Sequence, residues 1–330
     1  MRIAVTGSVA TDHLMVYPGR FTEQLVPDRL DRVSLSFLAD SLDIRHGGVA
    51  ANIAVGLARL GLTPVLAAAV GTDFADRRRL LEAQGVDTRL VRVSDTLHTA
   101  RFVCTTDADQ NQIATFYPGA MTEARLITLA PAARRGLELV LIGADDPEAM
   151  VRHTHACRRL GLPFAADPSQ QLARLESGAV RELVDGARYL FTNAYEAALI
   201  QRRTGWGRGE VLDRVGTWIS TLGADGVVIA RRGRPEVRID AVATDRAADP
   251  TGVGDAFRAG FLAGVAWDWT PEDAARLGCA LATVVLESVG TQEYKLSAAD
   301  LAIRMGKTYG EPTAATMRPR LSGALRPDWA

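Results

Sequence analysis

The sequence predicts an α/β fold in which a three-layer, doubly wound and mostly parallel sheet carries a smaller β-sheet as a lid. Between residues 137 and 240, short apolar strands alternate with helical segments, the pattern of a parallel sheet covered on both faces. Two strand-rich segments, at about 13–46 and 97–120, interrupt the alternation and are expected to form the lid. We expect one domain over residues 1–310. Residues 311–330 contain three prolines and no apolar period, which predicts a weakly ordered tail.

The composition is that of an ordinary globular protein, with 330 residues, 47% hydrophobic and 23% charged. The formal net charge of −1 gives no electrostatic reason to expect binding to nucleic acid or to an anionic membrane. No apolar run reaches membrane-spanning length, and the chain opens with a strand rather than a signal-peptide pattern. Its three cysteines and five histidines show no metal-binding spacing. We therefore expect a cytoplasmic protein whose partners are small molecules.

The first strand and the first helix supply two polar candidates. The strand at 3–5 runs into a turn, and Asp12 follows near the carboxyl edge of the sheet, where open α/β sheets bind ligands. A glycine pair at 47–48 precedes a helix that ends at Gly61, and Asn52 in its first turns can face a polar ligand. Taken alone, such an Asp is more often a turn residue and such an Asn usually faces solvent.

The lid segments supply a candidate pair of aromatic rings. Residues 99–106 and 112–117 are expected to form a hairpin, with Phe102 and Phe116 at comparable positions on its two arms. Most such pairs only pack, but a pair on the inner face of a lid can hold a flat ring. In the other segment, strand-like alternation over 32–38 places Ser36 where it could face a ligand, although a strand serine usually faces solvent.

Further polar residues follow the later strands, namely Gln170, Gln171, Asn193, Glu196 and the turn around Thr221. Asn193 and Glu196 lie on one turn and could hold Mg²⁺ through water, since that ion prefers an octahedral shell of oxygens. Considered singly, an Asn at a strand end and a Glu at a helix start are mostly structural.

The stretch 249–261 carries the strongest chemical signal. Gly252, Val253 and Gly254 run into Asp255, and a helix-compatible segment follows directly. Glycines before a helix let backbone N–H groups converge on a point where the helix dipole also favours an anion. A carboxylate beside an anion site suits a base that deprotonates a group attacking the anion. With an ordinary pKa of about 4, Asp255 would be ionised at neutral pH, so the pattern predicts phosphoryl transfer.

Other nucleotide and hydrolytic chemistries lack their signatures in this sequence. It contains no Gly-x-x-x-x-Gly-Lys-[Ser/Thr] P-loop and no Gly-x-Gly-x-x-Gly after the first strand. The protein-kinase His-Arg-Asp and Asp-Phe-Gly motifs are also missing, as is the Gly-x-Ser-x-Gly of serine hydrolases.

Three motifs, in this order, resemble the ribokinase (PfkB) family: Gly47-Gly48-x-x-x-Asn52, Asn193-x-x-Glu196 and Asp249-x-Thr-Gly-x-Gly-Asp255. The likeness spans roughly residues 1 to 310 and implies a ribokinase-like fold. Within the family, the segments at 7–14, 33–37, 165–171 and 286–293 are most similar to the bacterial adenosine kinases. The sequence departs from the family at Pro250 and Val253, where Thr and Ala are common; both glycines are kept.

The resemblance implies a role for each candidate. Asp255 is expected to be the catalytic base, with Gly252, Val253 and Gly254 as an anion hole and Glu196 with Asn193 organising Mg²⁺. A monovalent cation such as K⁺ would involve Asp249 and residues 289–291. The nucleoside is expected to contact Ser8, Asp12, Ser36, Gly48, Asn52, Phe102, Phe116, Gln170 and Gln171, and ATP is expected to contact Asn193, Thr221, Gly223, Gly226 and Arg174.

These expectations combine into an adenosine kinase that uses ATP and Mg²⁺. Gln170, Gln171 and the phenylalanine pair suit a purine better than a bare sugar. The alternatives are another sugar or nucleoside kinase of the family (ribokinase, fructokinase, or an inosine or guanosine kinase) and, from a different class, a non-catalytic nucleoside sensor. The exposed edges of the lid favour a homodimer.

Overall fold

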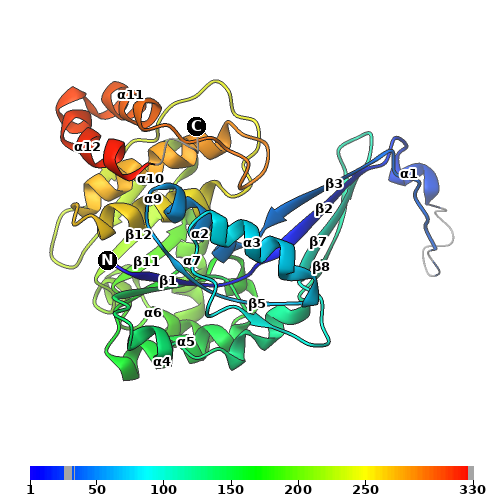
Figure 1. Ribbon diagram of the computed structural model, residues 1–330, viewed down its shortest axis with the longest axis horizontal. Helices are drawn as coiled ribbons and strands as arrows, with labels where there is room; N and C mark the ends of the chain where they lie inside the picture. The colour runs from blue at the N-terminus through cyan, green and yellow to red at the C-terminus, as the bar shows by residue number, and fades with distance from the viewer. Residues whose placement is uncertain (26–31, 33, 326–330) are drawn as a thin grey trace.

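The computed structural model describes residues 1–25, 32 and 34–325, and its centre is an eight-stranded sheet (Figure 1). The strand order is β14-β13-β12-β11-β10-β9-β1-β4, and all strands from β4 to β12 in that order run parallel. β13 and β14 add an antiparallel edge. The bounds are β1 (Ile3–Thr6), β4 (Val65–Ala67), β9 (Leu139–Ile142), β10 (Phe164–Ala166), β11 (Tyr189–Asn193), β12 (Thr217–Thr221), β13 (Val227–Ala230) and β14 (Val237–Ile239).

Helices cover both faces of this sheet, which confirms the predicted three-layer fold. Successive residues of a strand point to opposite faces, so Ile3 and Val5 join one core cluster while Ala4 joins the other. The first cluster contains residues from α2 (Val49–Arg59), α3 (Ala75–Ala83), α9 (Val253–Ala266), α10 (Pro271–Leu286), α11 (Ala298–Tyr309) and α12 (Glu311–Ala324). The second contains residues from α4 (Ala130–Ala133), α5 (Pro147–Leu160), α6 (Ser177–Val184), α7 (Ala194–Thr204) and α8 (Arg208–Leu212).

Several helices begin and end where the sequence supplies caps. Asp146 accepts a hydrogen bond from the Ala149 N–H and starts α5, with Pro147 at the first helical position, and Gly161 ends it in the left-handed region. The remaining short elements are α1 (Phe21–Gln24), β5 (Ala69–Val70), β6 (Arg92–Val93), η2 (Thr72–Phe74), η3 (Gly119–Leu126), η4 (Ser169–Ala173) and η5 (Gly223–Asp225). Among the described residues, no helix is both long enough and apolar enough to cross a membrane.

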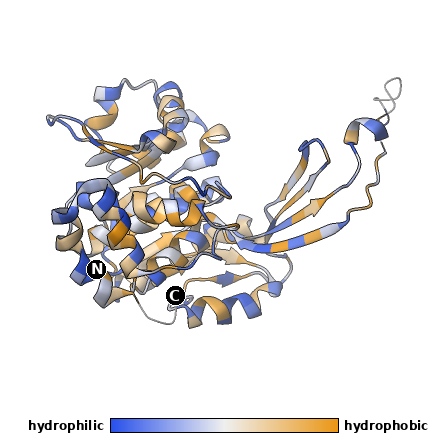
Figure 2. Cartoon of the chain, turned by 90° about the horizontal axis from the view of Figure 1, so that it is seen from above, coloured by the Kyte–Doolittle hydropathy of each residue, from blue (hydrophilic) through white to orange (hydrophobic). Residues whose placement is uncertain are grey.

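A second sheet projects from the main body (Figure 1). It pairs strands from the two segments expected to form a lid, in the order β3-β2-β7-β8. Figure 2 shows hydrophobic and hydrophilic residues mixed along these strands, whereas the strands of the main sheet contribute to two large clusters of buried apolar residues. The strands are β2 (Ala10–Val16), β3 (Ser41–Gly47), β7 (Ala100–Thr106) and β8 (Gln112–Tyr117).

The strand predicted at 32–38 is wrong in the part that the structure describes. Residues 34–39 have no regular secondary structure, and the partner of β2 begins at Ser41; Val33 lies outside the described residues. The Phe37 ring instead packs against Tyr17 and Phe21, with centroids 5.0 and 4.9 Å away. Phe37 therefore belongs to an aromatic cluster rather than to a strand.

The prediction of a weakly ordered tail is wrong for residues 311–324, which form α12. This helix buries Ala314, Met317 and Leu321 against the neighbouring core. Their spacing of three and four residues fits one helix face, but the stripe is sparse and lies among prolines. Pro312 occupies the first turn, where its missing N–H is not needed.

Candidate functional site

The N-terminus of α9 lies at the stretch where the sequence predicts an anion site. Gly252 caps the helix in the left-handed region, with φ of 76°, and a Cβ there would lie 2.8 Å from Cγ2 of Thr291. Within the described part of the chain, the N–H groups of Gly254 and Asp255 have no protein acceptor, whereas Val253 donates a long 3.4 Å bond to the Pro250 carbonyl. Among the described residues the Gly252 N–H also lacks a protein acceptor, so two of the three donors predicted from the sequence, Gly252 and Gly254, are free, and Asp255 adds a third.

Asp255 is held beside these donors by Asn52. The Asn52 Nδ2 donates to Oδ2 of Asp255 over 2.7 Å, although the two residues are far apart in sequence. Part of Asp255 remains accessible, yet protein atoms surround its carboxyl group, and this burial raises its pKa to about 7. Asp167 also raises the pKa, while the Asn52 hydrogen bond and Arg258 oppose the rise. The expectation of a pKa near 4 is therefore wrong, because it omitted burial.

A buried ion pair lies behind Asp255. Arg258, one turn further along α9, donates from Nε and Nη2 to the two carboxylate oxygens of Asp167 over 3.0 and 2.9 Å. Both side chains are almost fully buried. Asp167 follows β10 directly, so the pair ties α9 to the carboxyl edge of the central sheet. Sequence reasoning missed both partners, because neither belongs to a recognisable spacing.

Asn193 and Glu196 form a capping box at the start of α7. The Asn193 Oδ1 accepts from the Glu196 N–H over 2.8 Å, and Glu196 Oε2 accepts from the Asn193 N–H over 2.7 Å. Burial raises the pKa of Glu196, and the nearby Arg258 opposes the rise. Both residues therefore have the structural role that such residues usually have at a helix start. Only Oε2 of Glu196 takes part in the capping box, so Oε1 lies outside it.

This donor set suits magnesium held largely by water. Among the described residues, no group of three His, Cys, Asp or Glu side chains is arranged to hold a metal. Mg²⁺ commonly uses one or two carboxylates, several waters and substrate phosphates, so a single half-buried carboxylate at a sheet edge fits it. Asp249, expected near a monovalent cation, accepts from the N–H groups of Thr251 and Gly290, which brings the two proposed loops together.

Two of the expected sugar-binding residues, Asp12 and Gly48, lie where the lid strands β2 and β3 join the main body. Gly48 has φ of 97°, and a Cβ there would lie 2.6 Å from the Ser8 carbonyl oxygen. The Ser8 Oγ accepts from the Val49 N–H over 3.1 Å, so this side chain supports the start of α2. Burial raises the pKa of Asp12, with Glu293 adding to the rise and Arg45 opposing it.

Asp12 and the two phenylalanines lie on one face of the lid. In register, Asp12 pairs with Phe102 on β7, and Phe102 pairs with Phe116 on β8. Paired residues on adjacent strands share a face. The structure thus aligns a carboxylate and two rings across three neighbouring strands. Ser36, by contrast, is exposed beside the aromatic cluster of Phe37 and is not brought to this face by any described contact.

The remaining candidates lie around the carboxyl edge of the sheet. Gln171 is buried and Gln170 exposed, so the two side chains point to different surroundings; Arg174 is exposed after η4. Thr221 ends β12, and its hydroxyl donates to the Thr192 carbonyl. Gly223 and Gly226 have φ of 61° and 80° and form the turn between β12 and β13.

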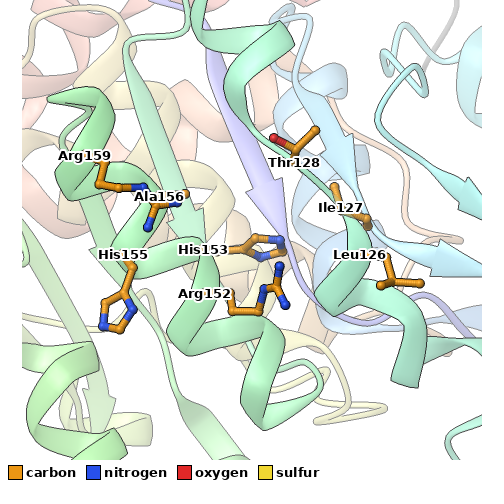
Figure 3. A pocket seen from close by; sticks show the side chains of 8 residues that line it. All are labelled: Leu126, Ile127, Thr128, Arg152, His153, His155, Ala156 and Arg159. Atoms are coloured by element: carbon orange, nitrogen blue, oxygen red, sulfur yellow. The ribbon is translucent and has the colours of Figure 1, made fainter.

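A pocket of about 310 Å³ lies elsewhere, between α5 and residues 126–128 (Figure 3). Arg152, His153 and Arg159 of α5 line it. Because α5 and α9 pack into different core clusters, this pocket is on the opposite face of the sheet from α9. It is not part of the site around Asp255.

The fold and the site together define a phosphotransferase of the ribokinase-like class, and comparison with known proteins supplies the family. The pattern described as "pfkB family carbohydrate kinase" matches residues 5–298. The chain therefore belongs to the PfkB family of carbohydrate kinases.

The chain is similar to nucleoside kinases, both in sequence and in solved structures. The nucleoside kinase of Methanothermobacter thermautotrophicus is 32% identical over 251 residues, 75% of this chain and 80% of the relative. The structure of Burkholderia thailandensis nucleoside kinase in complex with inosine shares 32% identity with a TM-score of 0.83, covering 93% of this chain and 99% of that one. The same enzyme in complex with ADP-inosine shares 34% identity with a TM-score of 0.79, covering 93% and 96%.

Proposed function

We propose that the protein is an ATP-dependent nucleoside kinase that phosphorylates the 5′-hydroxyl group of adenosine, giving AMP and ADP for purine salvage. The observation that carries the proposal is the placement of Asp255 beside the free N–H groups of α9, with Asn52 bonded to its carboxylate. The inosine bound to the Burkholderia enzyme supports a purine nucleoside as acceptor.

The reaction assigns a task to each part of the site. The ionised Asp255 carboxylate takes the proton of the 5′-hydroxyl group, whose oxygen bonds to the γ-phosphorus of ATP as the bond to the β-phosphate oxygen breaks. The N–H groups of Gly254 and Asp255 stabilise charge on the transferred group, an effect of a few kcal/mol per donor in comparable anion holes. ADP then leaves, and the proton remains on Asp255.

Mg²⁺ would be held at Glu196 through water and would neutralise phosphate charge. Thr221, Gly223, Gly226 and Arg174 would lie along the bound ATP, and K⁺ would bind near Asp249. The face of Asp12, Phe102 and Phe116 would take the sugar and the flat base. Stacking of a purine base on an aromatic ring contributes about 1–3 kcal/mol to binding, and a free pentose lacks this contribution.

A substrate panel tests the proposal. ADP release is measured with adenosine, inosine, guanosine, ribose and fructose at equal concentration, and adenosine should give the highest kcat/KM. Highest activity with inosine would favour a second candidate function, a kinase for 6-oxopurine nucleosides. The inosine complex of the Burkholderia enzyme is the observation that favours this candidate. Turnover of ribose alone would reject a nucleoside kinase, and binding of nucleosides without ADP release would indicate a sensor.

The lid is also the proposed dimer contact. Within the described residues, its outer strands β3 and β8 each pair on one side only, and they carry exposed Leu42, Ile44 and Ile113. Analytical ultracentrifugation at micromolar concentration should show twice the chain mass, and Ile44→Glu should shift the species to the monomer. A wild-type monomer under these conditions would reject the dimer without affecting the kinase assignment.

A further inference from the structure

A chain of hydrogen bonds leads from helix α3 to the carboxyl group of Asp255. Arg77 of α3 donates from Nη2 to Oε1 of Gln292. Gln292 donates from Nε2 to Oδ1 of Asn52 over 2.6 Å, and Asn52 donates to Asp255 over 2.7 Å. Arg77, Gln292 and Asn52 are 9%, 6% and 8% exposed, so water has little access to these bonds.

Because Arg77 can only donate, every hydrogen bond in this series must donate in the direction from Arg77 to Asp255. A guanidinium group only donates, so Gln292 must present its oxygen to Arg77 and its NH₂ to Asn52. Asn52 must then present its oxygen to Gln292 and its NH₂ to Asp255. Burial lowers the pKa of Arg77 to about 10, which leaves it protonated at neutral pH. The orientation of both amides thus follows from the fixed charge of Arg77, which is separated from the base by the two side chains of Gln292 and Asn52.

Thr291 cannot enforce the same orientation. Its hydroxyl group has one hydrogen but two acceptors, Oδ1 of Asn52 at 2.9 Å and the His46 carbonyl at 3.0 Å. While it donates to His46, its oxygen could accept from an Asn52 amide turned the other way. Gln292 is therefore the contact that excludes the reversed amide.

We propose that Gln292, anchored by Arg77, is a positioning residue for phosphoryl transfer, because it holds the Asn52 N–H toward the Asp255 carboxylate. The proposal rests on the function proposed above. It also specifies how Asn52 meets a substrate: its oxygen is already engaged by Gln292 and Thr291, so only an N–H is left, and a sugar hydroxyl group there must accept.

Other charges also face Asp255 and have to be separated from this effect. Asp167, after β10, and Arg258, on α9, act on it in opposite directions, and Glu196 of α7 lies near Arg258. In the described part of the chain, none of these three hydrogen-bonds to Gln292, whose partners are Arg59, Arg77, Asn52 and Glu293. Changes at Gln292 therefore leave the Asp167–Arg258 pair in place.

The test is the isosteric variant Gln292→Glu, because a carboxylate accepts from Arg77 but cannot donate to Asn52. The Asn52 amide should reverse and turn its oxygen toward Asp255, so that the acid limb of the pH profile of kcat/KM moves about one pH unit higher. For a base with a pKa of about 7, this reduces the ionised fraction at pH 7 from about one-half to about one-tenth, roughly a fivefold loss. Activity should recover above pH 9.

Two further variants identify the cause. Gln292→Met removes the donor without adding charge and should shift the limb in the same direction by less. Gln201→Glu makes the same chemical change on α7 and should leave the profile as in the wild type. An unshifted limb in Gln292→Glu, or a loss by the same factor at every pH, would make Gln292 a structural residue only and overturn the proposal.

A readout without turnover separates the two proposals. The ¹³C resonance of the Asp255 carboxyl group, identified by its absence in Asp255→Asn, is titrated in the wild type and in Gln292→Glu. The midpoint should be higher in Gln292→Glu, and equal midpoints would reject the positioning role. A wild type that phosphorylates no nucleoside would reject the proposed function, whatever the titration shows.

Discussion

The two sides of the candidate site are built by different means. On the side of α9, Asp255 and the Asp167–Arg258 pair are fixed by partly or fully buried hydrogen bonds between segments that are distant in sequence. On the side of the lid, strand pairing sets the backbone positions of Asp12 and Phe102, and β8 is exposed throughout. The groups expected to do chemistry are therefore held by tertiary contacts, while the groups expected to select the substrate are held by local backbone pairing.

The largest effect is expected from removing the buried cation on the fixed side. Arg258→Met leaves Asp167 charged and unpaired in a buried position, which should lower the free energy of unfolding by about 3–5 kcal/mol. Urea unfolding followed by circular dichroism measures this. The lid offers a matched control, Arg20→Met, which breaks the exposed pair with Asp109 and should cost less than about 1 kcal/mol. An equal fall in the free energy of unfolding in both variants would contradict the view that the α9 side depends more on its buried ion pair than the lid does on its exposed one.

Removing the base should abolish most turnover while sparing the fold. Asp255→Asn is expected to lower kcat by about 10²-fold or more, with ATP affinity by isothermal calorimetry unchanged. Asp268→Asn, at the other end of α9, is the control. Near-normal turnover of Asp255→Asn would exclude this residue as the base.

A smaller effect is expected from the lid. Phe102→Ala should raise KM for adenosine about tenfold and leave kcat within about twofold, because stacking on a base contributes roughly 1–3 kcal/mol. Val103→Ala, on the opposite face of the same strand, serves as its control. A change confined to kcat would mean that Phe102 acts on the chemical step. The assignment of chemistry to the α9 side and of substrate selection to the lid would then be wrong.

The smallest effect concerns pH. Asp255 must be ionised to act, and its pKa of about 7 predicts that kcat/KM rises about twofold between pH 7 and pH 8. The raised pKa also means that ionisation disfavours the folded state as pH rises from about 4 to 7. Asp255→Asn should therefore gain thermal stability relative to the wild type over that interval. A flat rate profile from pH 6 to 8 would place the base titration elsewhere.

The sequence predicted those parts of the molecule that depend on local pattern. The alternation of strands and helices gave the central sheet, and Gly252 before Asp255 marked the start of α9. The helical tail was mispredicted because three spaced apolar residues are a weak signal among prolines.

Contacts between distant segments could not be predicted. Arg258 meets Asp167 across 91 positions, and Gln292 meets Asn52 across 240. The raised pKa of Asp255 is of the same kind, because it arises from protein that folds around the carboxyl group and has no counterpart in the local sequence.

The in-register pairing of Asp12, Phe102 and Phe116 fixes the spacing of these three residues across the lid. Adjacent strands lie about 4.8 Å apart, and this interval is set by backbone hydrogen bonds rather than by side chains. The spacing between the backbone positions of Asp12, Phe102 and Phe116 is then kept in every variant that preserves the sheet. If the lid binds the nucleoside as proposed, exchanging a single side chain on β7 or β8 would change which ligand fits while the strand pairing stays the same.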